Sequence, residues 1–176
     1  MTSISVVADF KSVQKALTAI EKKVIPSASV TALNKTMAAH KIKLKRIIAF
    51  SNNVGQKLIE KKIKVYKAST KFRAALLWMN TSAIPVSRIG VPRVLKKGGV
   101  KVGRGRYFPN AFVFKSKFSH RDEAFVRGGG KLETVKIVIE PTAERTMRRL
   151  QAITHRTFMK FLVPEVERKL ARLRNK

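Results

Sequence analysis

The sequence predicts an α+β protein with two N-terminal helices, a small and mostly antiparallel sheet carrying a long basic, glycine-rich hairpin or arm, and a long C-terminal helix. Three observations support this fold class. Apolar residues recur at three- and four-residue spacing near both ends, β-prone runs fill the middle, and eight of the nine glycines lie between Gly90 and Gly130. With 176 residues and no clean boundary, we expect one domain over residues 1–176.

The N-terminal part is predicted to hold two helices after a short β-prone stretch at residues 3–7. Asp9 stands at the N-cap position of an amphipathic helix over residues 10–23. Pro26 interrupts that helix because proline has no backbone N–H, and it can open a second helix over about 27–50. The second helix has an apolar stripe formed by Val30, Leu33, Met37, Leu44, Ile47 and Ile48. Its cationic opposite side suits either a solvated face or a polyanion-binding face.

The middle of the chain is predicted to form strands. A helical turn at 56–62 leads into Ile63–Tyr66, which alternates as a strand does. Residues 71–80 are apolar on both faces at their centre, which predicts a central strand covered by helices. Trp78 is therefore expected to be a core anchor.

Three further strands and a helix complete the prediction. The strands are expected to be antiparallel, with turns at Gly128–Gly130 and around His120, and they cover residues 108–114, 123–127 and 133–140. Pro141 opens the last helix, and Pro164 must kink or restart it. The expected apolar positions of this helix are Ala143, Met147, Leu150, Ile153, Phe158, Phe161, Val166, Leu170 and Leu173.

The charge balance is the strongest functional signal. Lys and Arg number 39 against 10 Asp and Glu, which gives a net charge of +29. The surplus is spread over both halves of the chain, so this is not a neutral domain with a basic tail. Because so many like charges repel one another, we expect a polyanion or an acidic neighbour as partner, either nucleic acid or an acidic protein assembly.

The positive charge is least compensated in the middle. Between Lys61 and Arg121 there are 16 basic residues and no acidic residue. The basic segment, defined here as residues 88–108, reads as a long hairpin or as a flexible arm that orders only on assembly, and its glycines favour the arm. The side chains expected to contact the polyanion or partner are Lys96, Lys97, Lys101, Arg104 and Arg106.

Other chemistry finds little support. The absence of cysteine excludes disulfides, thiolate zinc sites and a cysteine nucleophile. The histidines lack metal-ligand spacing, the acids are thinly spread, and the glycine-rich stretch lacks P-loop spacing, so we expect no enzyme, metal or cofactor. No apolar run approaches the ~20 residues that cross a bilayer, so we expect a soluble protein made in the cytoplasm and no membrane partner.

Five short motifs follow one another along the chain. They are Ile25-Pro26, Ala32-Leu33-Asn34, residues 109–113 (Pro-Asn-Ala-Phe-Val), Phe125-Val126-Arg127, and a strand from Val135 that runs into Pro141. In this order they resemble the prophage minor tail protein Z family of long-tailed phages, also called tail completion proteins. The resemblance runs from about residue 8 to the C-terminus. It departs from the family at Asn110, where glycine is usual, and at the glycine triplet after Arg127.

The resemblance implies a structural virion protein that acts in tail completion and head–tail joining. Such a minor tail protein would sit at the head-proximal end of the tail, near the neck, as a homo-hexameric ring assembled in the host cytoplasm. Its implied partners are terminator, tube and connector proteins and the end of the genomic DNA. The competing interpretation is a ribosomal or nucleoid-type nucleic-acid-binding protein, for which size, charge and flexible basic loops would look the same. A nuclease ranks third.

Overall fold

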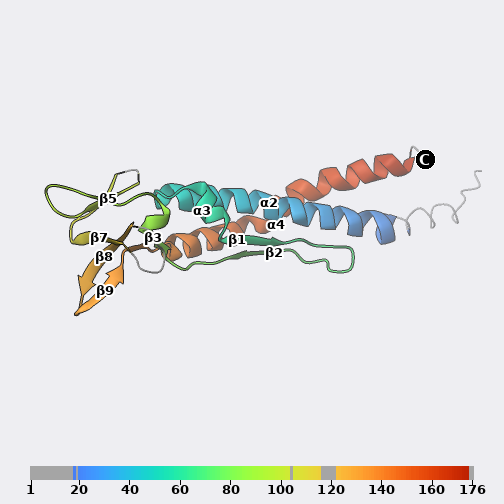
Figure 1. Cartoon of the computed structure of the whole chain (residues 1–176). Helices are drawn as coiled ribbons and strands as arrows, with labels where there is room; N and C mark the ends of the chain where they lie inside the picture. The colour runs from blue at the N-terminus through green and yellow to red at the C-terminus, as the bar shows by residue number, and fades with distance from the viewer. Residues whose placement is uncertain (1–17, 19, 104, 116–121, 175–176) are drawn as a thin grey trace, which may run out of the picture. The chain divides into compact units, whose positions relative to one another are not determined.

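The computed structural model describes residues 18, 20–103, 105–115 and 122–174. It confirms the α+β class, with an N-terminal helix, small antiparallel sheets and a long C-terminal helix (Figure 1). The helical elements are η1 (Ile20–Val24), α2 (Ile25–Ser51), α3 (Gln56–Glu60), η2 (Val86–Arg88) and α4 (Glu140–Arg174). The strands are β1 (Ile63–Tyr66), β2 (Leu76–Met79), β3 (Ile84–Pro85), β4 (Arg93–Val94), β5 (Val100–Val102), β6 (Arg106–Phe108), β7 (Ala111–Lys115), β8 (Asp122–Gly128), β9 (Lys131–Thr134) and β10 (Lys136–Ile137).

The chain divides into two compact units. The first unit holds the described residues of Met1–Lys41, Val65–Trp78 and Ala152–Lys176. The second unit holds those of Ile42–Lys64 and Met79–Gln151. Helices α2 and α4 each contribute residues to both units.

The start of α2 differs from the prediction. Most of the helix expected over 10–23 lies outside the described residues, but Ile20–Val24 forms a π-helical turn that joins α2 at Ile25. Pro26 therefore opens α2 as expected without separating two helices. A proline in the first turn costs little, because the N–H it lacks would have no partner within an α-helix that starts there.

In the first unit, α2 and α4 run antiparallel. Lys169 Nζ donates a hydrogen bond to Ser27 Oγ at 2.6 Å, and His40 Nε2 lies 3.1 Å from Thr154 Oγ1 in another. Residue numbers thus rise along one helix as they fall along the other. Between these contacts, the buried carboxylate of Glu165 accepts from Lys35 and from Arg168, one turn further along its own helix.

The buried line of α2 is not the predicted stripe. Buried side chains recur at every fourth position from Val24, the last residue of η1, along α2: Ala28, Ala32, Thr36, His40, Leu44 and Ile48. Three predicted positions are buried, but Ile47 is 44% exposed, so its placement in the stripe was wrong. The line follows the i, i+4 ridge of the helix, and small residues at Ala28 and Ala32 let a neighbour approach closely. A prediction that selects only large apolar side chains therefore misses this buried line.

Asn34 fastens the segment that follows β1. Its side chain accepts a hydrogen bond from the Ala68 backbone N–H at 2.8 Å and donates one to the Ala68 carbonyl at 3.0 Å. Ala68 is buried, so its backbone groups would otherwise lack partners. The asparagine thus replaces a strand partner for one residue of an irregular segment.

Strand β2 is shorter and less covered than predicted. It spans only Leu76–Met79 and pairs with β1 in a two-stranded sheet, so the expectation of a central strand over 71–80 was wrong. Trp78 is 44% exposed and is not the core anchor we expected. Burial alternates along β2, with Met79 buried and Trp78 exposed, which shows that only one face is covered.

In the second unit, β7, β8 and β9 form the predicted antiparallel meander. Gly129 and Gly130 make the β8–β9 turn with φ of 54° and 79°, a backbone region that glycine enters without strain. The turn expected around His120 lies outside the described residues. The third predicted strand divides at Val135, because β10 leaves the meander and pairs with β3. Each half therefore finishes a different sheet.

Helix α4 begins at Glu140, beside the predicted Pro141, and continues through Pro164 to Arg174. It therefore does not restart at Pro164. Its expected apolar stripe is uneven: Ala143 and Leu150 are buried, whereas Ile153 is 38% exposed and Leu173 is 47% exposed. Expecting those two positions to face inward was wrong. No described helix is long and apolar enough to cross a membrane.

Candidate polyanion-binding surface

The basic segment forms the three-stranded antiparallel sheet β4–β5–β6 in the second unit, which is the hairpin alternative of the two we considered. Lys101 at the centre of β5 pairs with Arg93 on β4 and with Tyr107 on β6. Directly paired residues point to the same side of a sheet, so these three side chains form one row. All three are exposed.

The opposite side of this sheet faces the core. Val100 and Val102, which flank Lys101 in β5, are 0% and 2% exposed. The alternation of valine, lysine and valine therefore fixes which side of β5 meets solvent. Burial of the two valines gives the basic row a rigid support.

Lys96 and Lys97 lie in the turn between β4 and β5, and both are exposed. The Leu95 N–H donates to the Gly99 carbonyl at 3.1 Å, and the Gly98 N–H donates to the Leu95 carbonyl at 2.9 Å. Tyr107 Oη donates to the Gly98 carbonyl at 3.1 Å and so ties the turn to β6. We call Arg93, Lys101 and Tyr107, with these two turn lysines, the cationic face.

Gly99 is required by this geometry. Its φ is 76°, and a Cβ at this position would lie 2.6 Å from the Phe108 carbonyl oxygen. Such an approach is shorter than van der Waals contact with a backbone atom, so only glycine fits. The tight turn brings β6 beside the lysine-bearing loop.

Arg106 does not belong to the cationic face. It pairs with Val102 and so lies on the inward side of the sheet, where its guanidinium donates to the Asn52 carbonyl just after α2. Carbonyls at the C-terminal end of a helix lack intrahelical donors and carry partial negative charge, which suits an arginine. Of the five predicted contact residues, Lys96, Lys97 and Lys101 are exposed, Arg106 points to the inward side of the sheet, and Arg104 lies outside the described residues.

Sequence reasoning missed Arg93 and gave Tyr107 no role beside the lysines. The signal was available in the alternation of Val100, Lys101 and Val102 between glycine turns. Treating these residues as a hairpin with a register would have placed both missed side chains next to Lys101. The interpretation of this segment as a flexible arm assumed no strand pairing, so it gave no register.

Cations also crowd one another elsewhere in this unit. Burial, and then the positive charge of Arg88, lower the pKa of Lys62. Its ammonium donates to the carbonyl and to the hydroxyl of Ser82, each at 2.7 Å. The protonated form of Lys62 is therefore disfavoured first by burial and only then by a neighbouring cation.

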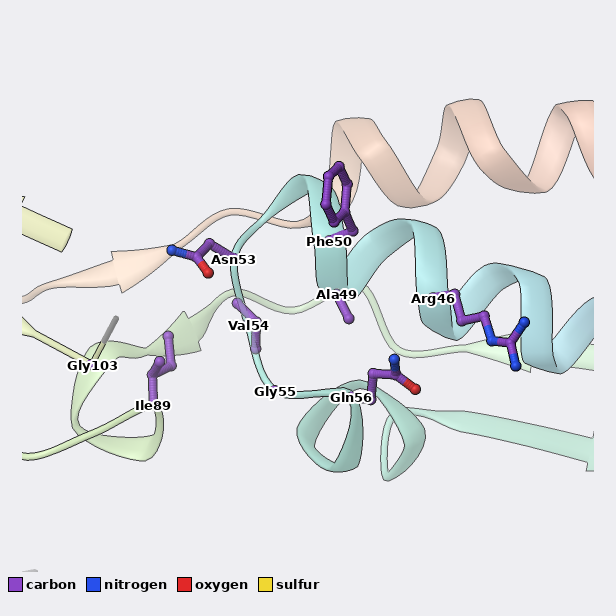
Figure 2. A pocket seen from close by; sticks show the side chains of 9 residues that line it. All are labelled: Arg46, Ala49, Phe50, Asn53, Val54, Gly55, Gln56, Ile89 and Gly103. Atoms are coloured by element: carbon purple, nitrogen blue, oxygen red, sulfur yellow. The ribbon is translucent and has the colours of Figure 1, made fainter. Parts of the chain in front are cut away.

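A surface hollow of about 580 Å³ lies at the end of α2 (Figure 2). It is lined by Arg46, Ala49, Phe50, Asn53, Val54, Gly55, Gln56, Ile89 and Gly103. Figure 2 shows Phe50 pointing away from Ala49, and Phe50 is 89% exposed. Arg46, Asn53 and Gln56 are its polar lining groups, so the hollow can accept a carboxylate or amide side chain of a neighbouring protein.

Groups that carry out metal or acid–base chemistry are scattered. Among the described residues, no three His, Asp or Glu side chains lie together as metal ligands would. His40 is buried in the helix pair described above, His155 is exposed on α4, and His120 lies outside the described residues. These placements leave the cationic face as the best candidate functional surface.

No protein-family model, no curated protein and no solved structure matches this chain.

Proposed function

We propose that the protein is a structural component of a phage tail, acting at the head-proximal end in tail completion and head–tail joining. The observation that carries the proposal is the cationic face, built on a rigid sheet in a chain of net charge +29 that has no acidic residue between Lys61 and Arg121. A surface of this kind is suited to a large, negatively charged assembly. The end of the genomic DNA or an acidic neck or tube protein would meet it.

The resemblance to tail completion proteins supplies the setting, and several motif residues have definite tasks in the fold. Asn34, from the Ala-Leu-Asn motif, holds both backbone groups of Ala68. Phe112 and Phe125, from two further motifs, face each other across β7 and β8.

In this proposal the subunits form a homo-hexameric ring on the axis of the tail, near the neck of the virion. A ring requires head-to-tail contacts between different patches of neighbouring subunits. The hollow near Phe50 and Arg46 is suited to receive a side chain of a neighbour. The cationic face would then remain available for DNA or for the terminator, tube and connector proteins.

A ribosomal or nucleoid-type nucleic-acid-binding protein is the second candidate. The observation that favours it is Tyr107, which lies beside Lys101 on the exposed side of β6. Aromatic rings beside basic side chains give bases a surface on which to stack, as in many single-strand binders. This candidate predicts a monomer that binds isolated RNA tightly, with affinity that falls steeply as salt rises.

Two variants isolate the contribution of the cationic face. The face variant carries Arg93→Gln, Lys96→Gln, Lys97→Gln and Lys101→Gln. The control variant carries four changes of the same residue types at exposed positions in the first unit: Lys67→Gln, Lys71→Gln, Arg73→Gln and Lys160→Gln. Each removes three lysines and one arginine, so the two variants have the same net charge and differ only in place.

The test is co-expression of the full chain with the proteins encoded beside it, followed by purification and electron microscopy. We expect defined rings that carry neck or tube proteins from the wild type and the control variant, and loss of these complexes from the face variant. A monomer that binds RNA and none of these proteins would favour the second candidate. A chain that binds neither would overturn both.

A further inference from the structure

The outward side of the β7–β9 meander carries a cluster of aromatic residues. The register pairs Phe112 with Phe125 and Arg127 with Leu132, which places these side chains on one side. The alternate residues Ala111 and Ala124 are buried on the other side. We call this outward side the aromatic face; its members are Phe112, Phe114, Glu123, Phe125, Arg127, Leu132 and Thr134.

The aromatic face is organised and open to solvent. The ring centroids of Phe112 and Phe125 are 6.4 Å apart, and Phe114 meets Phe125 edge-on at the same distance. Phe114 is 52% exposed and Leu132 is 58% exposed. Arg127 Cζ lies 5.8 Å from the centre of the Phe112 ring, which holds the guanidinium over the cluster. Grouped apolar side chains of this kind on a folded surface mark an interaction site.

Charge indicates which partner fits. Within the described residues of β7, β8 and β9, three cations stand against three carboxylates: Lys115, Arg127 and Lys131 against Asp122, Glu123 and Glu133. The rest of the chain therefore carries the whole surplus of 29 positive charges. Nucleic acid is disfavoured here because phosphates would meet carboxylates. Two copies of this chain repel each other through their cationic surfaces. At the neutral meander a second copy can approach without this repulsion.

The order of side chains along β8 is self-complementary. Glu123, Phe125 and Arg127 occupy alternate positions and so lie in a row on the aromatic face, with the negative and positive groups on either side of the ring. A two-fold axis through Phe125 places Arg127 of one copy beside Glu123 of the other, twice. A contact between identical patches in this arrangement is an isologous interface.

We propose that the aromatic face is a two-fold self-association surface, on which a second copy of this chain docks with its own aromatic face. This contact differs from the head-to-tail contacts that close a ring, so the inference goes beyond the proposed function. Association should strengthen as salt screens the repulsion between cationic chains, whereas binding to DNA weakens with salt.

The first test is sedimentation equilibrium of the full chain over a range of protein and salt concentrations. We expect a monomer–dimer equilibrium that Leu132→Asp weakens by at least about tenfold, the effect of removing one buried apolar side chain from an interface. Leu76→Asp is the matched control, because Leu76 is also 58% exposed but lies on β2, and it should leave the constant unchanged. Phe114→Ser, at a second exposed position, should act as Leu132→Asp does. A monomeric wild type, or equal effects of the two leucine variants, would overturn the proposal.

The second test exchanges charges on β8. Arg127→Glu and Glu123→Arg should each weaken association, because each places like charges across the two-fold axis. The double variant should recover it, since the pairs are again opposite, and circular dichroism should show native folding throughout. A natively folded double variant that associates no better than the single variants would refute the two-fold arrangement. Because none of these changes lies on the cationic face, DNA binding by the same samples tests the proposed function separately.

Discussion

Arg106 should behave as a structural residue although the sequence groups it with the contact residues. Its guanidinium donates to the Asn52 carbonyl from the inward side of β6, and Asn52 itself is buried. A hydrogen bond from a charged donor contributes about 1.5–3 kcal/mol. Because Arg106 is partly exposed, we expect Arg106→Gln to cost about 1.5–2 kcal/mol, the lower part of that range. For a chain of this length, that loss lowers Tm by roughly 3–8 °C.

Lys101→Gln is the matched comparison, because it removes one charge from the neighbouring strand. Lys101 is exposed in β5, so its removal should change stability by less than about 0.5 kcal/mol. Thermal unfolding followed by circular dichroism, at one salt concentration for both variants, measures the difference. Polyanion binding should show the reverse order, with Lys101→Gln weaker and Arg106→Gln close to the wild type. Equal melting temperatures for the two variants would refute the structural role of Arg106.

Two further predictions concern the first unit. Asn34→Ala should lower the free energy of unfolding in urea by about 2–3 kcal/mol, because it leaves both backbone groups of buried Ala68 without a hydrogen-bond partner. Asn34→Asp keeps the acceptor and should cost less. Equal costs for the two variants would contradict the pairing. Lys35 and then Arg168, by hydrogen bonds, lower the pKa of Glu165 below its ordinary value of 4.5. The stability that this carboxylate adds is therefore complete above that value and is lost as pH falls through the lowered pKa. Melting at pH 7 and at an acidic pH well below the lowered pKa should show that Glu165→Gln is destabilised only at the higher pH, and an equal deficit at both would refute the linkage.

Secondary structure was predictable from the sequence where local rules decide it. Helix α2 and the antiparallel arrangement of β7 and β8 follow from spacing, from a proline near a helix start and from a glycine turn, all of which act within a few residues. The third predicted strand, 133–140, shares only its first two residues with β9 (Lys131–Thr134). The opening of α4 next to Pro141 follows in the same way. Each of these signals is contained in the segment that it shapes.

The predictions that were wrong concern burial and side-chain direction, which depend on residues far away in the sequence. Trp78 looks like a core residue in its apolar run, but Leu76 and Trp78 on one face of β2 are 58% and 44% exposed. Nothing in the sequence of residues 71–80 indicates that this face is only partly covered. Ala28 and Ala32 line the buried side of α2 although larger residues nearby looked better suited. The sorting of Arg106 from Lys101 likewise requires the register between β5 and β6. The lysine-rich composition indicated where the candidate surface lies in the sequence. The pairing of the strands determines which side chains belong to that surface.

The most direct test of the cationic face is the salt dependence of DNA binding by the wild type, the face variant and the control variant. Fluorescence anisotropy with a short duplex gives log K against log salt, whose slope falls by about 0.9 for each phosphate that the protein no longer neutralises. We expect the slope of the face variant to fall by about 3–4 and that of the control variant to match the wild type. If both variants are weakened equally in affinity and in slope, binding follows net charge alone and the cationic face is not a site.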